Sequence, residues 1–581
     1  MWFEKNKIKS KNNTFFIKQW MTKVSKKSPG LKIISKYLKL YYEYSTINSF
    51  KYFVDSQRPW FERILWIIIH CTIISFLVFM VYISYYEFMT TPLVTSTETD
   101  DYKTTLLSFP AIAICSVNRI SRQSATELAT NISKTNITNQ TVDEILILIM
   151  RLGNLYIYNF DTLGLTDNNH DVELDKLLTT YYNGTYDVTE IMKTLTPQCS
   201  MMLLKCKLHG KYTNCSTLFN FRKTPDGYCC TFNYVRESDD IPEQNDVTEL
   251  SKPEQVWDLG IERGLTVVMD PLLDDYFYSI LPIKGWKAIV FNPTDYPDMT
   301  SGGVTEVLAV PLSETFLNVV GTLFISNPGI ENFPRNKRNC IFSDEGKLLS
   351  SITMYTYSDC IVNCKINFIQ KSCGCRPFFY PRHGIKDYSW RICNSLDFEC
   401  LAKHKSDWLT ILPHEEEHTN FEKEEKALHC YNCYAACEDI SYDVLSWTTD
   451  MTPGEFNTNL LQNYNVTDEG IVHIYFSKYG TIRLKQDMSF YWYDLVSDIG
   501  GICGVFIGFS FITIVELLYF FVLMFRDLFC KKSALQKDDD RKTKIPSDQT
   551  QTTGTIYWNE LQPRSWHSAK YGKFSANRVR Y

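Results

Sequence analysis

Two long apolar segments stand out from a sequence that otherwise mixes polar and apolar positions. Residues 64–86 contain no Lys, Arg, Asp or Glu, and from residue 499 to residue 525 the only charge is Glu516. Each segment is long enough to cross a bilayer as an α-helix. The first begins too far into the chain for a cleaved signal peptide. The pattern therefore predicts two transmembrane helices on either side of a long polar region.

The second apolar segment is unusually polar for a plain membrane anchor. Besides Glu516 it contains four glycines and the hydroxyl side chains of Ser510 and Thr513. Glycine weakens a helix, and a carboxylate in hydrocarbon is costly unless it faces water or a partner. We interpret this segment as a helix that lines an ion pathway.

Charge orients the chain in the membrane. Residues 1–63 contain 14 Lys or Arg against 4 Asp or Glu, and residues 526–581 contain 12 against 6. Since the whole chain has a net charge of −6, the region between these flanks is strongly acidic. Basic flanks stay on the cytosolic side. We expect a plasma-membrane protein with two spans and both termini in the cytosol.

Cysteines and glycosylation signals place the central region outside the cell. Of 19 cysteines, 16 lie between Cys115 and Cys437, which indicates disulfides formed in an oxidising compartment, although the sequence leaves their pairing open. Asn-x-Ser/Thr signals, whose glycans need exposed surface, occur in the same region. The expected glycosylation sites are Asn131, Asn136, Asn139, Asn183, Asn214 and Asn465.

The central region mixes strand and helix patterns. Residues 304–326 and 470–484 are rich in β-branched and aromatic residues, which predicts strands, and residues 142–152 are expected to be helical. The Thr-rich residues 90–105 are expected to form a linker. The strand-like run 472–492 leads into the second span with almost no linker, so movement of an outer sheet would pull directly on the membrane helix.

A cysteine-rich stretch and a polar tail complete the organisation. Residues 340–437 hold ten cysteines and are expected to form a thin lobe that depends on disulfides instead of a thick hydrophobic core. Residues 531–581 are polar and mixed in charge, and are expected to be disordered.

Several short motifs follow one another in a fixed order. They are Phe109-Pro110-Ala111 leading to Cys115 and Asn118-Arg119, Gly227-Tyr228-Cys229-Cys230 leading to Asn233, Arg338-Asn339-Cys340, the cysteine-rich lobe, Ser497-Asp498-Ile499-Gly500-Gly501, and Gly508-Phe509-Ser510. With these motifs the chain resembles the degenerin/epithelial sodium channel family, most closely its insect pickpocket-like branch, from about residue 45 to residue 525.

The resemblance implies a fold and an assembly. The fold is a membrane protein with two transmembrane helices flanking a large α+β, disulfide-rich extracellular domain, and the assembly is a homo- or heterotrimeric channel for Na⁺ that amiloride blocks. The expected parts are a cytosolic region (1–62), transmembrane helix 1 (63–86), the extracellular domain (87–494) with its stapled lobe (340–437), transmembrane helix 2 with the pore (495–525), and a cytosolic tail (526–581).

Gly508-Phe509-Ser510 matches the selectivity filter of that family. Glycine frees backbone carbonyls, and a ring of serine hydroxyls and carbonyls can replace part of the hydration shell of Na⁺. The competing interpretation is that Gly500, Gly504 and Gly508 are small residues at i, i+4 spacing that pack one helix against another.

Further pore positions follow from the same resemblance. Ser497 falls at the degenerin position, where a bulky side chain tends to hold the gate open, and Gly504 falls at the amiloride-binding position. Asp498 and Glu516 lie 18 residues apart. In an unbroken helix that is five turns, about 27 Å, so both acids would share a face and attract cations at the two mouths. The resemblance, however, implies that this helix breaks at the filter, in which case the straight-helix spacing does not hold.

The sequence departs from the family just before the first span. Asn48 and Ser49 stand where the family has a His-Gly pair, in a motif that resembles a turn lining the inner pore. Asn tolerates left-handed backbone, whereas Ser gives up the freedom of glycine. This pre-span gating turn is therefore expected to change how readily the channel opens.

The resemblance also implies a disulfide pattern. The implied pairs are Cys115–Cys229, Cys206–Cys215, Cys340–Cys437, Cys360–Cys433, Cys364–Cys430, Cys373–Cys400 and Cys375–Cys393, with Cys199 and Cys230 left for an eighth pair.

Other signals are weaker. His414 and His418 match a His-Glu-x-x-His zinc peptidase pattern. The surrounding run is acidic and polar, so we interpret it as an exposed charged helix, with a surface proton or divalent-ion sensor as the minority alternative. No nucleophile constellation or phosphate-binding loop is evident in the sequence. We expect no enzyme activity, no metal, no cofactor and no nucleic-acid partner.

The sequence thus predicts a subunit of a trimeric, amiloride-sensitive, ligand- or mechanically gated Na⁺ channel. Its partners would be Na⁺, related subunits, the bilayer and an unidentified extracellular stimulus. One alternative is a two-span glycosylated scavenger or adhesion receptor, which leaves the pore-like polar residues unexplained. Another is an ATP-gated channel, which the acidic central region disfavours because ATP needs a basic site.

Overall fold

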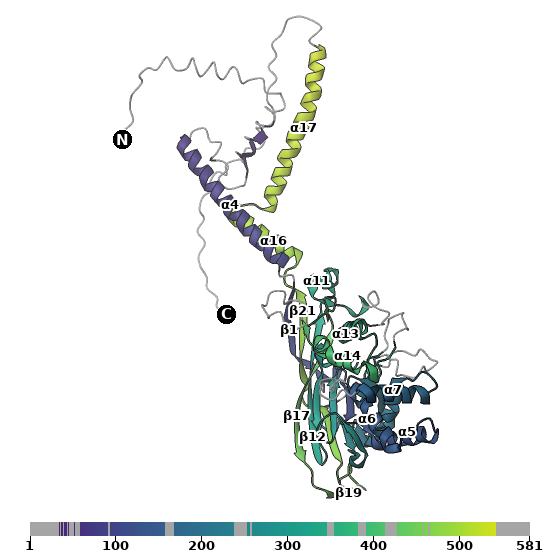
Figure 1. Ribbon diagram of the computed structural model, residues 1–581. Helices are drawn as coiled ribbons and strands as arrows, with labels where there is room; N and C mark the ends of the chain where they lie inside the picture. Colours follow the sequence, from purple (N-terminus) through teal and green to yellow (C-terminus); the bar gives the residue numbers. More distant parts are fainter. Residues whose placement is uncertain are drawn as a thin grey trace, which may run out of the picture. The chain divides into compact units, whose positions relative to one another are not determined.

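The computed structural model divides into two compact units. It describes residues 34, 37, 38, 40–42, 44, 45, 52, 59–90, 93–156, 168–236, 252–255, 258–345, 354–381, 391–412, 427–456, 458–462 and 465–541. One unit combines Met1–Ser84 with Val496–Tyr581 and contains both apolar segments; we call it the helical unit. The other, Tyr85–Leu495, is the large domain (Figure 1).

The large domain is built on an eight-stranded mixed sheet with the order β1-β21-β12-β20-β8-β4-β5, in which β17 also pairs with β12. These strands are β1 (Leu93–Lys103), β4 (Leu203–Leu208), β5 (Lys211–Thr213), β8 (Leu265–Met269), β12 (Ser313–Ser326), β17 (Asp439–Asp450), β20 (Gly470–Phe476) and β21 (Gly480–Met488). The strands expected within 304–326 and 470–484 are confirmed. The longest, β12, is parallel to β20 and β21 and antiparallel to β17.

A second, five-stranded sheet has the order β11-β10-β2-β7-β6. Its strands are β2 (Ala111–Ser116), β6 (Phe219–Thr224), β7 (Gly227–Phe232), β10 (Trp286–Phe291) and β11 (Thr305–Ala309). Apolar side chains of both sheets form one core, in which Ile114 and Trp286 lie with Leu317 and Val472. Short strand pairs add β3 (Asn118–Ser121) with β9 (Tyr276–Ser279), β13 (Cys340–Ile341) with β16 (Ala435–Ala436), β14 (Ile411–Leu412) with β15 (Leu428–His429), and β18 (Gly454–Glu455) with β19 (Asn465–Val466).

The Thr-rich segment expected to be a linker is the edge strand β1. It pairs antiparallel with β21, from Leu93 opposite Met488 to Lys103 opposite Gly480. Threonine and valine favour extended backbone, and an edge position tolerates polar side chains because one side of the strand meets solvent. The polar, Thr-rich composition of this segment therefore led to a wrong prediction of a linker where the structure has a strand.

Helices pack beside the sheets. The helices and 3₁₀ turns from residue 104 to residue 301 are η1 (Thr104–Leu106), α5 (Arg122–Lys134), α6 (Val142–Met150), η2 (Arg151–Leu155), α7 (Asn168–Tyr181), α8 (Val188–Leu195), α9 (Cys199–Met202), α10 (Cys215–Leu218), η5 (Leu273–Asp275) and η6 (Met299–Ser301). The expected helix at 142–152 is confirmed as α6 and η2. Thr141 starts it with a capping box, because its hydroxyl accepts the Glu144 N–H while the Glu144 carboxylate accepts the Thr141 N–H.

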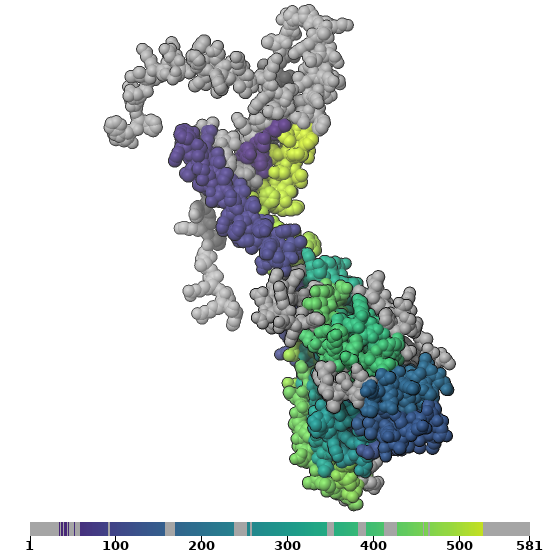
Figure 2. Space-filling view, viewed as in Figure 1, coloured from purple at the N-terminus to yellow at the C-terminus, as the bar shows by residue number. Residues whose placement is uncertain are grey.

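The cysteine-rich lobe follows β12. Between β12 and the lobe lie η7 (Pro328–Asn332) and α11 (Arg335–Arg338), and the lobe itself contains η8 (Ser343–Glu345), α13 (Tyr357–Cys373), η9 (Ser395–Asp397), α14 (Phe398–Lys403) and α15 (Lys405–Leu409). Contrary to expectation, the lobe has a substantial core. Ile366, Phe379 and the fully buried Trp408 share one apolar cluster with Ile145 of α6 and Leu178 of α7. In Figure 2 the green lobe lies directly against the blue helices α5–α7.

Eight disulfides staple the large domain. They are Cys115–Cys229, Cys199–Cys230, Cys206–Cys215, Cys340–Cys437, Cys360–Cys433, Cys364–Cys430, Cys373–Cys400 and Cys375–Cys393. All seven pairs implied by the resemblance are among them, and Cys199–Cys230 is the eighth. Cys360 and Cys364 lie one turn apart on α13, so two disulfides tie the same face of this helix to the segment that precedes β16.

The helical unit contains most of α4 (Trp60–Thr90), α16 (Trp492–Ile507) from Val496 onward, and α17 (Phe511–Arg541). By length and composition α4 can cross a membrane, and α16 with the first part of α17 can do so as one bent pair. The rings of Phe76 on α4 and Phe506 on α16 lie 5.5 Å apart. The tail was expected to be disordered from residue 531, but α17 continues to Arg541 because Lys, Ala, Leu and Gln favour helix and no proline occurs before Pro546.

Candidate ion pathway

The second apolar segment breaks between α16 and α17. The two helices diverge by 75°, and Gly508-Phe509-Ser510 forms the break (Figure 1). Gly508 has φ 68°, the left-handed conformation that commonly ends a helix. Its N–H donates to the Gly504 carbonyl at 3.0 Å, and the Phe509 N–H donates to the Cys503 carbonyl at 3.2 Å. These two bonds finish α16.

Ser510 starts α17. Its hydroxyl oxygen accepts the Thr513 N–H at 3.4 Å, and its own N–H donates to the Thr513 hydroxyl at 3.2 Å. This reciprocal pair resembles a capping box, in which two otherwise unpaired N–H groups at a helix start are satisfied. Thr513 is fully buried and was missed as part of the site. The Ser-x-x-Thr spacing was the available signal.

The break takes three backbone carbonyls in the middle of an apolar segment out of the helical hydrogen-bond pattern. Within the described chain, no backbone N–H donates to the carbonyls of Ile507, Gly508 or Phe509. Backbone carbonyls without a partner in hydrocarbon are costly, and are tolerated where they line a water-filled cavity. Carbonyl oxygens are also the groups that replace water around a permeating cation. The side chain of Ser510 is exposed next to them.

Asp498 and Glu516 lie on different helices. Asp498 is exposed on α16 and Glu516 is half-buried on α17. Because of the 75° bend, the expected arrangement on one face of an unbroken helix, about 27 Å apart, is wrong. The left-handed Gly508 is the physical reason, since an unbroken helix needs negative φ at every residue.

The other expected pore positions on α16 are open in the single chain. Ser497 and Gly504 are exposed. A Cβ added at Gly500 or Gly501 would meet nothing within 4 Å, and one at Gly504 would lie 3.7 Å from the Phe509 carbonyl oxygen. The surface of α16 therefore leaves room for a neighbouring helix or for water.

Two groups of expected residues lie outside the described residues: Asn48 with Ser49, and His414 with His418. On either side of the pre-span turn, two aromatic pairs are described. Tyr41 packs edge-on against Phe520 of α17 at 5.5 Å, and Tyr52 stacks on Trp66 of α4 at 4.7 Å.

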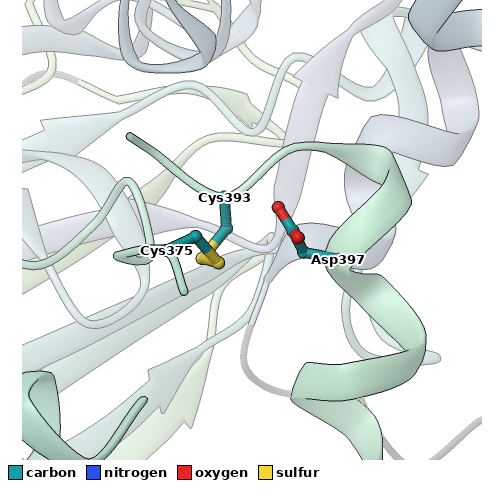
Figure 3. A group of neighbouring side chains, drawn as sticks. All are labelled: Cys375, Cys393 and Asp397. Atoms are coloured by element: carbon teal, nitrogen blue, oxygen red, sulfur yellow. A yellow bond between two sulfur atoms is a disulfide. The ribbon is translucent and has the colours of Figure 1, made fainter. Parts of the chain in front are cut away.

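One cluster of potential metal ligands occurs among the described residues. Figure 3 shows Cys375, Cys393 and Asp397 with the two sulfur atoms joined as a disulfide. A disulfide offers no thiolate, and both Asp397 carboxylate oxygens bind the Arg391 guanidinium at 2.5 Å. The cluster consists of a disulfide next to an Asp397–Arg391 ion pair, and it does not fit a metal.

The central sheet contains one buried histidine. His473 of β20 is 5% exposed, and its Nε2 lies 2.7 Å from a carboxylate oxygen of Glu314. Because a carboxylate can only accept, Nε2 of the ring carries the proton and donates to Glu314. In the neutral ring Nδ1 is then the acceptor, and the Thr266 hydroxyl donates to it at 2.9 Å. Burial lowers the pKa of His473, although the hydrogen bond to Glu314 acts in the opposite direction.

All six expected glycosylation sites are exposed on the large domain. Asn131 lies on α5, Asn136 and Asn139 lie between α5 and α6, and Asn183 follows α7. Asn214 precedes α10 and Asn465 begins β19. Exposed side chains in this arrangement leave space for glycans.

These features define a class of membrane protein: a disulfide-rich α+β domain is inserted between one apolar helix and a second helix that breaks at a glycine. The chain belongs to the amiloride-sensitive sodium channel family, also called the degenerin/epithelial sodium channel family, and to its insect pickpocket-like branch. The match to that family covers residues 41–520. The family consists of ion channels.

Three relatives illustrate the similarity. Sodium channel protein Nach of Drosophila ananassae is 24% identical over 487 residues, which cover 83% of this chain and 86% of that protein. Pickpocket protein 28 of Drosophila melanogaster is 24% identical, with 83% and 77% covered. Bile acid-sensitive ion channel of Mus musculus is 24% identical, with 80% and 83% covered.

Proposed function

We propose that this chain is a pore-forming subunit of a trimeric, amiloride-sensitive, Na⁺-selective channel of the plasma membrane, gated by a ligand or by force. Membership of the family supports conduction of Na⁺ and assembly with related subunits. In this proposal the large domain is extracellular, residues 63–86 and 495–525 span the bilayer, and both termini are cytosolic. The exposed glycosylation sites and the disulfides of the large domain are consistent with that orientation.

The break at Gly508-Phe509-Ser510 carries the proposal. Three copies of this break around an axis would place carbonyl oxygens and Ser510 hydroxyls in a ring. Such a ring replaces part of the hydration shell of Na⁺, and its size and field strength set the preference over K⁺. Small-residue packing alone would not require the left-handed Gly508, nor neighbouring carbonyls that accept no backbone N–H from the described residues.

The other pore roles are assigned along the same two helices. Ser497 is the gate position, Gly504 is the amiloride position, and Asp498 and Glu516 are the acids that attract cations outside and deep in the pore. The pre-span turn at Asn48 and Ser49 tunes opening.

Permeability measurements in oocytes test the filter. Ser497→Phe is expected to produce a standing Na⁺ current that amiloride reduces, and Ser497→Ala is the small-residue control. In the Ser497→Phe background, Ser510→Leu is expected to change the Na⁺/K⁺ permeability ratio, whereas the volume-conserving Ile512→Leu leaves it unchanged. An unchanged ratio in Ser510→Leu would refute the filter. Silence of Ser497→Phe at the cell surface, alone and with related subunits, would refute the channel.

A further inference from the structure

One carboxylate joins three segments just before α16. Oδ1 of Asp487, the penultimate residue of β21, accepts the Tyr491 hydroxyl at 2.9 Å, the Asn327 side-chain amide at 2.8 Å and the Met488 N–H at 2.8 Å. Lys485 Nζ lies 3.5 Å from Oδ2. Partial burial raises the pKa of Asp487, but these donors outweigh it and hold the pKa below its usual value. The carboxylate is therefore charged and engaged near neutral pH.

Tyr491 is the residue from which α16 begins. Its N–H donates to the Asp494 carboxylate at 3.0 Å, an arrangement that caps a helix start, and its ring stacks on Tyr493 at 5.1 Å. The first helical bond of α16, from the Leu495 N–H, ends on the Tyr491 carbonyl at 3.2 Å. A constraint on the Tyr491 side chain therefore constrains the first turn of α16.

Asn327 is the residue at which β12 gives way to the lobe. Its Oδ1 accepts the Gly329 N–H at 3.0 Å and so starts η7, while its own N–H donates to the Gln486 carbonyl at 2.9 Å. The chain then passes through α11 to Cys340, whose disulfide with Cys437 closes the base of the lobe. Asn327 thus begins the segment that joins the end of β12 to the lobe. We call this segment, residues 327–340, the lobe base.

We propose that Asp487 is a positioning residue for gating, which couples the lobe base at Asn327 to the first turn of α16 at Tyr491. The backbone from β21 to α16 transmits tension along the chain. The two side-chain hydrogen bonds on Asp487 add a second link, which holds the first turn of α16 within the large domain. The effect on gating rests on the proposed channel function, whereas the hydrogen-bonded coupling itself is a property of the large domain.

A carboxylate that accepts from one tyrosine hydroxyl and one asparagine amide also occurs elsewhere in the large domain, away from the membrane segments. Oδ1 of Asp175 on α7 accepts the Tyr186 hydroxyl at 2.6 Å and the Asn394 amide at 2.9 Å, and Asn394 starts η9 as Asn327 starts η7. Tyr186→Phe and Asn394→Ser are therefore matched controls for Tyr491→Phe and Asn327→Ser. In both serine variants the start of the 3₁₀ turn keeps a capping hydroxyl while the amide donor is lost.

Hydrogen–deuterium exchange on the purified full-length chain tests the coupling without any current. Tyr491→Phe and Asn327→Ser should each accelerate exchange of the amides of α16 at 495–499 by about five- to tenfold, the effect of losing one hydrogen bond. Coupling is reciprocal, so Tyr491→Phe should also accelerate exchange in η7. The two controls should leave both segments unchanged. Acceleration confined to the mutated element would refute the coupling.

Current recordings then test whether this coupling acts in gating. In the Ser497→Phe background, Tyr491→Phe and Asn327→Ser should each change the standing current by at least about fivefold, with an unchanged Na⁺/K⁺ permeability ratio and unchanged surface expression. The control variants should retain the parental current. Coupled exchange with an unaltered current would refute a role in gating. Coupled exchange with no current from any variant, Ser497→Phe included, would instead refute the proposed channel function.

Discussion

Replacing Gly508 with alanine tests whether the left-handed backbone between α16 and α17 sets ion selection. At φ 68° an L-residue other than glycine brings its Cβ against the following carbonyl, at a cost of about 1–2 kcal/mol. In a trimer this cost acts three times, so the broken conformation loses roughly 3–6 kcal/mol relative to alternatives with negative φ. Alanine also favours helix more than glycine does, which promotes fusion of α16 with α17.

The assay is the current and the Na⁺/K⁺ permeability ratio of Gly508→Ala in the Ser497→Phe background. We expect the Na⁺ current to fall at least tenfold at equal surface expression, because about 3 kcal/mol corresponds to more than a hundredfold change in population. Gly508→Asn provides a graded control, since asparagine tolerates left-handed backbone better than alanine. It should retain more current than Gly508→Ala although its side chain is larger.

Two results would refute this reasoning. Parental current and selectivity in Gly508→Ala would show that the left-handed conformation is not needed for conduction. A greater loss in Gly508→Asn than in Gly508→Ala would show that side-chain bulk, and not backbone conformation, decides the outcome.

Two further predictions concern buried titratable side chains in the large domain. Because burial lowers the pKa of His473, its neutral form stabilises the fold; this contribution is full above the unfolded pKa of about 6.5 and is lost as the pH falls. The melting temperature should therefore drop more between pH 7.5 and pH 5 in the wild type than in His473→Gln, and equal drops would contradict the assignment. Lys365 lies 2.7 Å from Asp298, and both side chains are buried. Lys365→Met should lower the free energy of unfolding by about 3–5 kcal/mol, and adding Asp298→Asn should recover most of it; no recovery in chemical denaturation would argue against the ion pair.

The sequence predicted the elements whose signals are local. The strands around β12 and β20 follow from β-branched and aromatic residues, and the helix expected over residues 142–152 is found as α6 and η2. The disulfide pairs came from resemblance, since sixteen cysteines in one region allow far too many connectivities for spacing to decide.

What the sequence missed depends on partners distant in the chain. The polarity of β1 indicates a linker until β21 is known to lie beside it. The stapled lobe was expected to lack a thick core because of its dense cysteines, but Trp408 shares an apolar cluster with residues of helices α5–α8, which precede it by more than two hundred residues. Asp487 carried no signal of its own, because the donor Asn327 lies 160 residues earlier in the chain, just after β12.

The straight-helix spacing of the two pore acids failed for a different reason. Helical periodicity placed Asp498 and Glu516 on one face, and a glycine within an apolar run is compatible with both a continuous and a broken helix. Only the backbone conformation at Gly508 distinguishes the two. The filter motif was found by resemblance, whereas its cap by Thr513 was missed although the Ser-x-x-Thr spacing could have indicated it.

The pairing of β1 with β21 has a consequence for biosynthesis. β1 follows the first membrane helix and β21 precedes the second, so nearly the whole large domain is made between the two strands. At roughly 5–20 residues per second of synthesis, β1 waits on the order of tens of seconds for its partner, and β12 waits for β20 and β21 in turn. During this time the unpaired edges would need protection by chaperones of the secretory pathway. Chains that terminate before residue 470 would leave the main sheet open and would be retained before reaching the cell surface.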